Sequence, residues 1–559
     1  DNIASNYSNL GDYNKSLELT LRAYKIYERS YNSNKVGLTS QLLATNKSKL
    51  ELSFQFLASL SCIDPSEVNV LNTSWMNLNG AIQAGQAQLL QHLSQNKDTS
   101  LLILVEELKL SKMQLSKYNE MTLSEKENKG IDETVLVEKI NKTETELSKR
   151  SQYFADFSRL VGAKDLVSQL TENEVLVDII RFPYYDFKNI GWTDSVKYLV
   201  FISDSKDTLV EHVFIHKGKD LENELFSNYN SYTSRSNNTS EQKDELSYDY
   251  FWKPIAEKIG DAKTVYISLG GIYNNINLNT LYNLKTEKYL LEEKDIRIVN
   301  SARDFILMKE RETKNYSSNT AALFGYPNYD GTSIATIDSN DYLASTRDLN
   351  SFWVDSLTRG GMKATLLPAT KTEVENISAT LNENDWQVTG YLQNDASEEN
   401  IKQLNSPRVL HIATHGYFFE DVPKDLSNDR FMGMDRQTVV QNPLLRSGLL
   451  FTGANKTLQG NETKGDNGLL SAYEAALLDL SETELVVLSA CETGRGEIKN
   501  SEGVYGLRKA MSDAGAANTI MSLWKVDDKV TQEFMTTFYS TWLSGKTIRE
   551  AFIKLGSSI

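Results

Sequence analysis

A histidine and a cysteine follow two separate apolar runs near the C-terminal end of this chain. His415 comes directly after residues 408–414, and Cys491 follows residues 484–489 after one intervening residue. Both runs predict buried strands. The carboxyl ends of parallel strands meet at one edge of a sheet, where α/β proteins usually build their chemistry, so the two side chains are expected to lie close together. A thiol beside an imidazole is a nucleophile beside a proton carrier, which predicts acyl transfer with Cys491 as nucleophile and His415 as acid and base.

Three neighbouring residues complete the predicted site. Gly416 follows His415, and the absence of a Cβ lets a substrate approach its backbone N–H. We expect the N–H groups of Gly416 and Cys491 to bind the oxyanion formed in the reaction. His411 is expected to be structural and to orient the loop rather than react. Glu492 is expected to be a solvated or packing carboxylate.

From residue 321 onward, predicted strands alternate with predicted helices. The strands are expected at 322–326, 387–392, 408–414, 484–489 and 518–523. The helices are expected at 370–381, 397–404, 503–513 and 530–543, with capping boxes at 370–373 and 471–474. Such βαβ alternation predicts an α/β fold with a mainly parallel sheet covered on both faces.

Two regions precede this α/β part. Residues 1–161 predict a helical domain that resembles the end of one tetratricopeptide repeat, with Tyr7 on a first helix and Gly11 in the turn. Near Gly162 the period changes, and short runs rich in Val, Ile, Tyr and Phe predict strands. We therefore divide the chain into domains at 1–161, 162–315 and 316–559.

The composition is that of an ordinary globular protein. The chain has 559 residues, of which 40% are hydrophobic and 24% charged, and a net charge of -16, which argues against a general nucleic-acid binder. With only Cys62 and Cys491 present, we expect no disulfide framework, no metal cluster and no cofactor, and we place the protein in a reducing cytoplasm. No apolar run reaches the ~18 residues of a membrane span, and no signal peptide opens the chain. Because the chain begins at Asp1 within a helical repeat, we expect a fragment or a processed form.

The chain resembles the CHAT-domain proteins, a caspase-like, clan CD, separase-related family of cysteine peptidases that is often fused to tetratricopeptide repeats. The resemblance runs from about Val175 onward. It is carried by the following phrases: His411-Ile412-Ala413-Thr414-His415-Gly416, Asn442-Pro443-Leu444, Asn467-Gly468-Leu469-Leu470-Ser471-Ala472, Ser489-Ala490-Cys491-Glu492-Thr493-Gly494 and Ser522-Leu523-Trp524-Lys525-Val526-Asp527-Asp528.

The resemblance implies a caspase-like, three-layer α/β/α fold in which His415 and Cys491 form the catalytic dyad. Residues 162–315 would be a degenerate, non-catalytic copy of the active half. Two features depart from the pattern. Ser489 stands where caspases place a glutamine, so a preference for aspartate in the substrate is in doubt. The family usually continues into a further aromatic strand, whereas this chain stops at Ile559.

The resemblance also suggests which residues contact the substrate. Caspase-like folds shape their first specificity pocket from loops that in this chain carry Asp330, Asp527 and Asp528. We expect one or more of these carboxylates to accept an Arg or Lys side chain at the P1 position of the substrate. The alternative is that Asp527 and Asp528 only cap the helix that begins near Lys529.

The leading hypothesis is a cytoplasmic endopeptidase that cleaves a specific protein and is controlled by an activator protein or complex bound to its helical domain. The resemblance implies a place in bacterial defence, with a gasdermin-like pore former or a CRISPR-linked protein as substrate. No contact with nucleic acid or membrane is expected. Two alternatives remain: a non-catalytic scaffold, and an acyltransferase or transpeptidase that uses the same dyad.

Overall fold

The computed structural model separates the chain into two compact units. The first unit comprises Asp1–Leu104, Asn141–Lys314 and Ile498–Gly503, and the second comprises Val105–Ile140, Asn315–Glu497 and Val504–Ile559. Each unit contains a five-stranded sheet. The division after residues 161 and 315 stays a prediction about folding units. The structure describes residues 7, 11–34, 40–78, 99–121, 126, 133–150, 160–233, 244–311, 316, 318–331, 363–419, 430–431, 434–435, 439, 442–459, 466–490, 497–499, 503–523 and 527–556.

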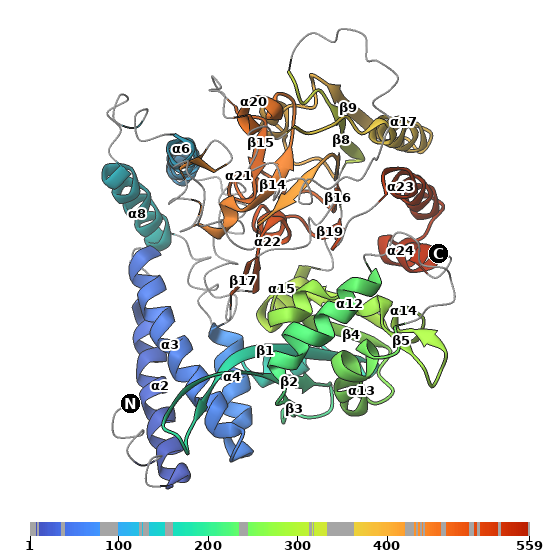
Figure 1. The fold of residues 1–559 in the computed structure, drawn as a ribbon. Helices are drawn as coiled ribbons and strands as arrows, with labels where there is room; N and C mark the ends of the chain where they lie inside the picture. The colour runs from blue at the N-terminus through green and yellow to red at the C-terminus, as the bar shows by residue number, and fades with distance from the viewer. Residues whose placement is uncertain are drawn as a thin grey trace. The chain divides into compact units, whose positions relative to one another are not determined.

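The sheet of the first unit is mixed, with strand order β3-β2-β1-β4-β7 (Figure 1). A long antiparallel hairpin forms between β1 (Glu174–Asp186) and β2 (Gly191–Ser203), and β3 (Glu211–Ile215) continues the antiparallel pairing. On the other side of β1, β4 (Thr264–Ser268) and β7 (Asp295–Val299) run parallel to it. Side chains alternate between the faces of a strand, and β1 is buried over most of its length, so both faces of this sheet are covered.

Three N-terminal helices cover one face of the first sheet. They are α2 (Tyr13–Asn34), α3 (Ser40–Ser61) and α4 (Val68–Leu78). Their apolar side chains share a core with Ile180 and Phe182 of β1. The other face packs on the helices between β3 and β4. The helical N-terminal region predicted from the sequence is therefore confirmed, and its helices α2–α4 belong to the same compact unit as the first sheet.

The sheet of the second unit is entirely parallel, with strand order β19-β16-β10-β8-β9. Its central strand β10 is buried at every position, as expected of a parallel strand covered on both faces. The five strands lie within two residues of their predicted bounds: β8 (Thr320–Pro327), β9 (Gln387–Gln393), β10 (Val409–Ala413), β16 (Leu485–Ser489) and β19 (Asn518–Met521).

Helices cover both faces of the second sheet. One core contains apolar residues of the sheet together with those of α17 (Pro368–Asn382), α23 (Asp528–Leu543) and α24 (Ile548–Gly556). The other core includes α21 (Ala472–Ala475) and α22 (Leu507–Asp513). The predicted α/β class with three layers is therefore confirmed for this unit.

Of the two predicted capping boxes, one is present. Ser471 caps α21 by accepting from the Glu474 N–H, and the Glu474 carboxylate accepts from the Ser471 N–H in return. The prediction for Thr370 was wrong. Pro368 occupies the first turn of α17, where its fixed φ favours helix initiation, so the helix begins earlier. The Thr370 hydroxyl instead donates to the Leu367 carbonyl at 2.7 Å.

A small antiparallel sheet adjoins the carboxyl end of β10. Its strands are β11 (Gly416–Phe418), β14 (Ser447–Leu450) and β15 (Leu469–Ser471), in the order β11-β14-β15. The short helix α20 (Ala454–Leu458) follows β14. The small sheet begins directly after His415, so the chain leaves the parallel sheet at that residue.

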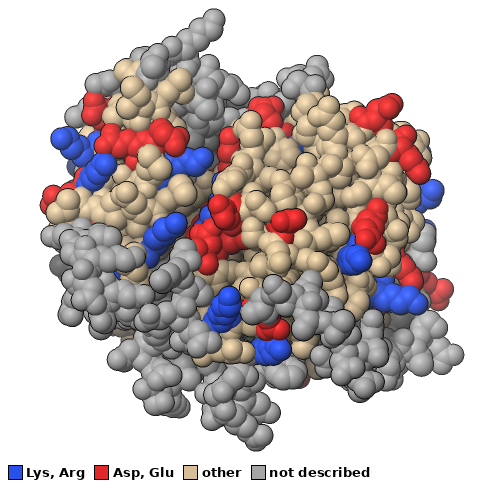
Figure 2. Space-filling model, turned by 90° about the horizontal axis from the view of Figure 1, so that it is seen from above, with Lys and Arg blue, Asp and Glu red and all other residues tan. Residues whose placement is uncertain are grey.

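The described helices lack the combination of length and apolar character that crossing a bilayer requires. On the face drawn in Figure 2, acidic and basic side chains of the described residues are interspersed.

Candidate active site

His415 lies in the two-residue step between β10 and β11. Its position follows from the change of sheet, because β10 ends at Ala413 and β11 begins at Gly416. The residue is 1% exposed. Its carbonyl accepts from the Leu450 N–H at 3.0 Å, which anchors the turn to β14.

A backbone carbonyl orients the His415 ring. Nε2 of His415 lies 2.8 Å from the carbonyl oxygen of Thr365, in the segment that leads into α17. A carbonyl only accepts hydrogen bonds, so Nε2 must carry the proton. In the neutral ring Nδ1 is then the basic nitrogen, and it is the atom that would take a proton from a thiol.

Tyr329 packs against the other side of this histidine. The two ring centroids are 5.3 Å apart, and the tyrosine hydroxyl accepts from the His415 N–H at 3.4 Å. The same hydroxyl lies 2.8 Å from Oγ1 of Thr414, which itself donates to the Leu450 carbonyl. These contacts therefore connect the end of β10, the rings of Tyr329 and His415, and the small sheet.

Gly416 begins β11 directly after His415. It faces Leu449 across β11 and β14, and the bond from the Leu450 N–H to the His415 carbonyl makes this a non-hydrogen-bonded pair. The N–H of Gly416 therefore points away from β14. That direction is compatible with the predicted role in binding an oxyanion.

Cys491, the predicted nucleophile, and Glu492 lie outside the described residues. The strand that leads to Cys491 is described, and its register is informative. β16 lies beside β10 in parallel, with Ser489 opposite Ala413. These are the residues two positions before Cys491 and His415, and neighbouring parallel strands lie about 4.8 Å apart. The sheet therefore places the starts of the two segments side by side, on adjacent strands and opposite each other in the register.

His411 lies in a buried polar cluster beneath this edge. Its Nε2 is 3.0 Å from Oε1 of Glu373 on α17, and its Nδ1 is 3.3 Å from the hydroxyl of Tyr539 on α23. The Ser489 hydroxyl donates to the same Glu373 oxygen at 2.6 Å. The side chains of His411 and Glu373 are fully buried. Glu373 thus joins the strand that leads to His415 with the strand that leads to Cys491, in keeping with a structural role for His411.

The three carboxylates predicted to bind substrate have different surroundings. Asp527 caps α23 by accepting from the N–H groups of Lys529 and Val530, which is the capping alternative considered from the sequence. Asp528 is buried and accepts from the Ala369 N–H at 3.0 Å, in the first turn of α17.

Asp330 has a side chain that is half exposed, unlike that of Asp528, which is buried. It accepts from the Asn455 amide at 2.8 Å and lies 3.3 Å from the ammonium group of Lys363. It directly follows Tyr329, the residue that packs on His415. Of the three, Asp330 combines an exposed carboxylate with a position next to Tyr329, which packs on His415.

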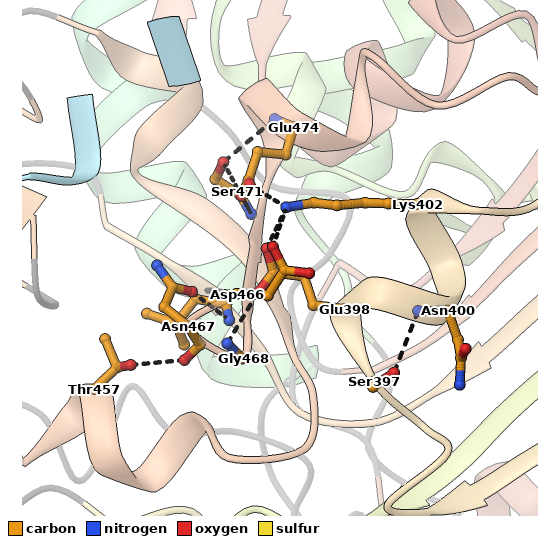
Figure 3. A network of polar contacts seen from close by, with 11 residues as sticks. Ser397, Glu398, Asn400, Lys402, Thr457, Asp466, Asn467, Gly468, Ser471 and Glu474 are labelled. Atoms are coloured by element: carbon orange, nitrogen blue, oxygen red, sulfur yellow. Dashed lines mark hydrogen bonds and ion pairs between the residues drawn. The ribbon is translucent and has the colours of Figure 1, made fainter. Parts of the chain in front are cut away.

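A lysine with three carboxylates fixes the small sheet that carries Gly416 (Figure 3). The ammonium group of Lys402 contacts Glu398, lies 2.6 Å from Glu474 and lies 3.2 Å from Asp466. Glu398 also accepts from the Gly468 N–H, just before β15. Burial, and after it the charge of Glu474, raise the pKa of Glu398 to about 8. Burial lowers the pKa of Lys402, but Glu474 and Glu398 outweigh this effect and raise it.

Sequence reasoning missed Thr365, Tyr329 and Glu373. Thr365 acts through its backbone carbonyl, which leaves no signal in the residue type. Glu373 was interpreted as part of a capping box, and its spacing on a predicted helix gave no indication that it would be fully buried beside His411. These contacts connect segments separated by 38 or more residues, so local pattern does not contain them.

A comparison with protein families identifies a domain that includes residues of both units. The model of the CHAT domain matches residues 245–554, which is more than half of the chain. The CHAT domain is a caspase-like fold related to cysteine peptidases, in agreement with the parallel sheet. No curated protein matches the chain. The chain belongs to the CHAT-domain family.

Proposed function

We propose that this protein is a cysteine endopeptidase with a dyad of His415 and Cys491. The observation that carries the proposal is the register of β10 and β16, which sets the residues two positions before His415 and Cys491 side by side. The fixed tautomer of His415 adds support, because Nδ1 is left as the basic nitrogen.

The reaction proceeds in two steps. His415 Nδ1 takes the thiol proton, and the Cys491 thiolate attacks the scissile carbonyl carbon. The Gly416 N–H donates to the resulting oxyanion. As the C–N bond breaks, the imidazolium gives its proton to the leaving amine, and a thioester remains. Water then gives a proton to His415 and attacks the thioester, which releases the new carboxyl terminus and returns the proton to the thiol.

The P1 residue of the substrate is proposed to be Arg or Lys, held by Asp330. This carboxylate is half exposed and is paired with the exposed ammonium group of Lys363. A surface pair of this kind contributes only about 0 to 1 kcal/mol, so a substrate cation can replace Lys363 at little cost. Asp527 and Asp528, which hold helix termini, are secondary candidates for this role.

The natural partners belong to the proposal as well. A specific bacterial protein, gasdermin-like or CRISPR-linked, is the proposed substrate in an antiphage defence system, and an activator bound at the helical region is proposed to release activity. The proposed compartment is the cytoplasm, where Cys62, a free thiol directly after α3, would stay reduced.

The test is co-expression with the products of neighbouring genes, in which wild type is compared with Cys491→Ala and His415→Ala. A new cleavage product that forms with wild type and is lost in both variants supports the peptidase. Cleavage that persists in Cys491→Ala contradicts it. Product mass spectrometry separates hydrolysis from acyl transfer, since a transferase joins the acyl fragment to an acceptor other than water.

A further inference from the structure

The second unit contains a clamp on the segment that orients His415. Asn455, in α20, is 2% exposed. Its Oδ1 accepts from the Ala364 N–H at 2.6 Å, and its Nδ2 donates to the Ala364 carbonyl at 3.1 Å. One side chain therefore holds both backbone groups of the residue directly before Thr365.

The orientation of the Asn455 amide is fixed by its partners. The Ala364 N–H can only donate, so the atom facing it is the oxygen. The Ala364 carbonyl and the Asp330 carboxylate can only accept, so the atom facing both is the nitrogen. Aspartate has the same shape as asparagine but no donor, and at this position it would face two oxygen acceptors.

The backbone of Asn455 is held as well. Its N–H donates to the carbonyl of Tyr329 at 2.9 Å. Asn455 thus joins both segments that contact the His415 ring: Tyr329, which packs on the ring, and Ala364, whose neighbour Thr365 accepts the Nε2 proton.

We propose that Asn455 is a positioning residue for His415. This inference rests on the peptidase function proposed above. Without the clamp, the Thr365 carbonyl is no longer held at hydrogen-bond distance from Nε2, and the ring loses the contact that keeps Nδ1 as the base. A misplacement of about 1 Å in an active site can cost ~100-fold in rate. Loss of the Asn455 side chain is therefore expected to weaken proton transfer between the His415 imidazole and the Cys491 thiol.

The first unit offers a matched control. Asn77 at the end of α4 holds Val161 by the same two bonds, from Nδ2 to the carbonyl at 2.9 Å and from the Val161 N–H to Oδ1 at 3.0 Å. It is 5% exposed. Asn77→Asp therefore introduces the same chemical change, in a clamp that does not contact His415.

The experiment measures the alkylation rate of Cys491 by iodoacetamide from pH 5 to 10, with mass spectrometry of the separate peptides that contain Cys491 and Cys62. Asn455→Asp is expected to slow alkylation about 10- to 100-fold at pH 7 and to move the midpoint of its pH profile upward, toward that of an ordinary thiol. At high pH its rate should approach the wild-type rate, because the thiolate then forms without help from His415. Asn77→Asp should stay within about twofold of wild type.

A labelling control and a second variant separate loss of His415 positioning from loss of the fold. Burial raises the pKa of Cys62 to about 11, so labelling of Cys62 at pH 7 reports opening of the first unit. All variants are measured below their own Tm values, and Asn455→Ser, which removes the clamp without adding a charge, is the second variant. A wild-type pH profile in both Asn455 variants overturns the positioning role. If Cys491→Ala abolishes cleavage in that case, the peptidase assignment still stands.

Discussion

The two five-stranded sheets of this chain differ in the direction of their strands. The first is mixed, with the long antiparallel hairpin β1–β2 next to parallel β4 and β7, whereas the second is parallel throughout. Only in a parallel sheet do all carboxyl ends reach the same edge, where side chains from several strands can meet. The second sheet places His415 and the segment leading to Cys491 at that edge.

The sheets also differ in how they bury a carboxylate. Glu373 beneath the second sheet has His411 and Ser489 as partners. Asp178 in β1 is 2% exposed, and no cation among the described residues pairs with it. Burial raises the pKa of Asp178 to about 7, although Ser268 and Trp75 partly offset the effect. Beneath the second sheet, the buried carboxylate of Glu373 contacts the two strands that lead to the carboxyl edge. In the first sheet, Asp178 is buried without a cation among the described residues.

The largest expected effect separates the two sheets by chemistry. His415→Ala should lower the cleavage rate by about 1000-fold or more, because the proton carrier is lost. His212→Ala, in β3 of the first sheet, should leave the rate within about twofold. Rates are to be measured on the substrate found by co-expression, with Tm values as the control. Comparable losses in both variants would break the distinction between an active and an inactive sheet.

The second effect concerns the ion networks of the two units. Lys402→Met should destabilise the protein by about 3 to 5 kcal/mol, because it leaves Glu398 and Glu474 buried without their cation. The loss should be smaller at pH 5 than at pH 8, since Glu398, whose pKa burial raises to about 8, is neutral at pH 5.

Arg181→Met in the first unit is the matched change. It removes the pair between Arg181 and Glu222, whose side chains are 24% and 21% exposed, and should cost only about 1 kcal/mol. Denaturant titrations at both pH values provide the measurement. Equal losses in the two variants would show that the Lys402 network stabilises the protein no more than the Arg181–Glu222 pair does.

The third prediction concerns a substitution that should stabilise the protein rather than destabilise it. A carboxyl group whose pKa rises from 3.8 to about 7 on folding leaves stability unchanged below pH 4 and reduces it progressively between pH 4 and pH 7. The penalty at pH 8 is on the order of 4 kcal/mol, so Asp178→Asn should raise stability by about 1 to 3 kcal/mol there, less than the full amount because the amide is also buried.

This gain should vanish near pH 4. Glu373→Gln on α17, beneath the second sheet, should destabilise at pH 8 instead, because a neutral amide oxygen accepts more weakly than a carboxylate from the Ser489 hydroxyl. Tm values at pH 4 and pH 8 test both statements. A destabilising Asp178→Asn at pH 8 would contradict the view that this acid is poorly accommodated.

The smallest effect concerns a helix end in the second unit. Asp527→Ala should cost about 1 kcal/mol by removing the cap of α23, whereas Asp527→Asn should cost only a few tenths because asparagine also caps. If Asp330 is the main P1 carboxylate, cleavage after Arg or Lys should survive in Asp527→Asn. Loss of that preference would make Asp527 a substrate ligand as well as a cap.

Much of the second unit could be predicted from local pattern. The apolar runs at 408–414 and 484–489 became β10 and β16 because each is long enough for a buried strand and too short for a helix. The Ser471 cap followed from its spacing to Glu474. Thr370 shows where pattern fails, because a proline two residues earlier started the helix before the expected cap.

The sequence by itself determined the alternation of strands and helices, the strand that ends before His415 and the family to which the chain belongs, because these depend on residue types and spacing along the chain. Only the tertiary structure decided that Thr365 fixes the His415 tautomer, that Asn455 holds Ala364, the residue before Thr365, and that Glu373 joins β10 to β16. These contacts join segments far apart in the chain, and two of them involve backbone groups that every residue carries. Such bonds leave no mark on composition or periodicity, so they arise only once the sheet and its helices have packed.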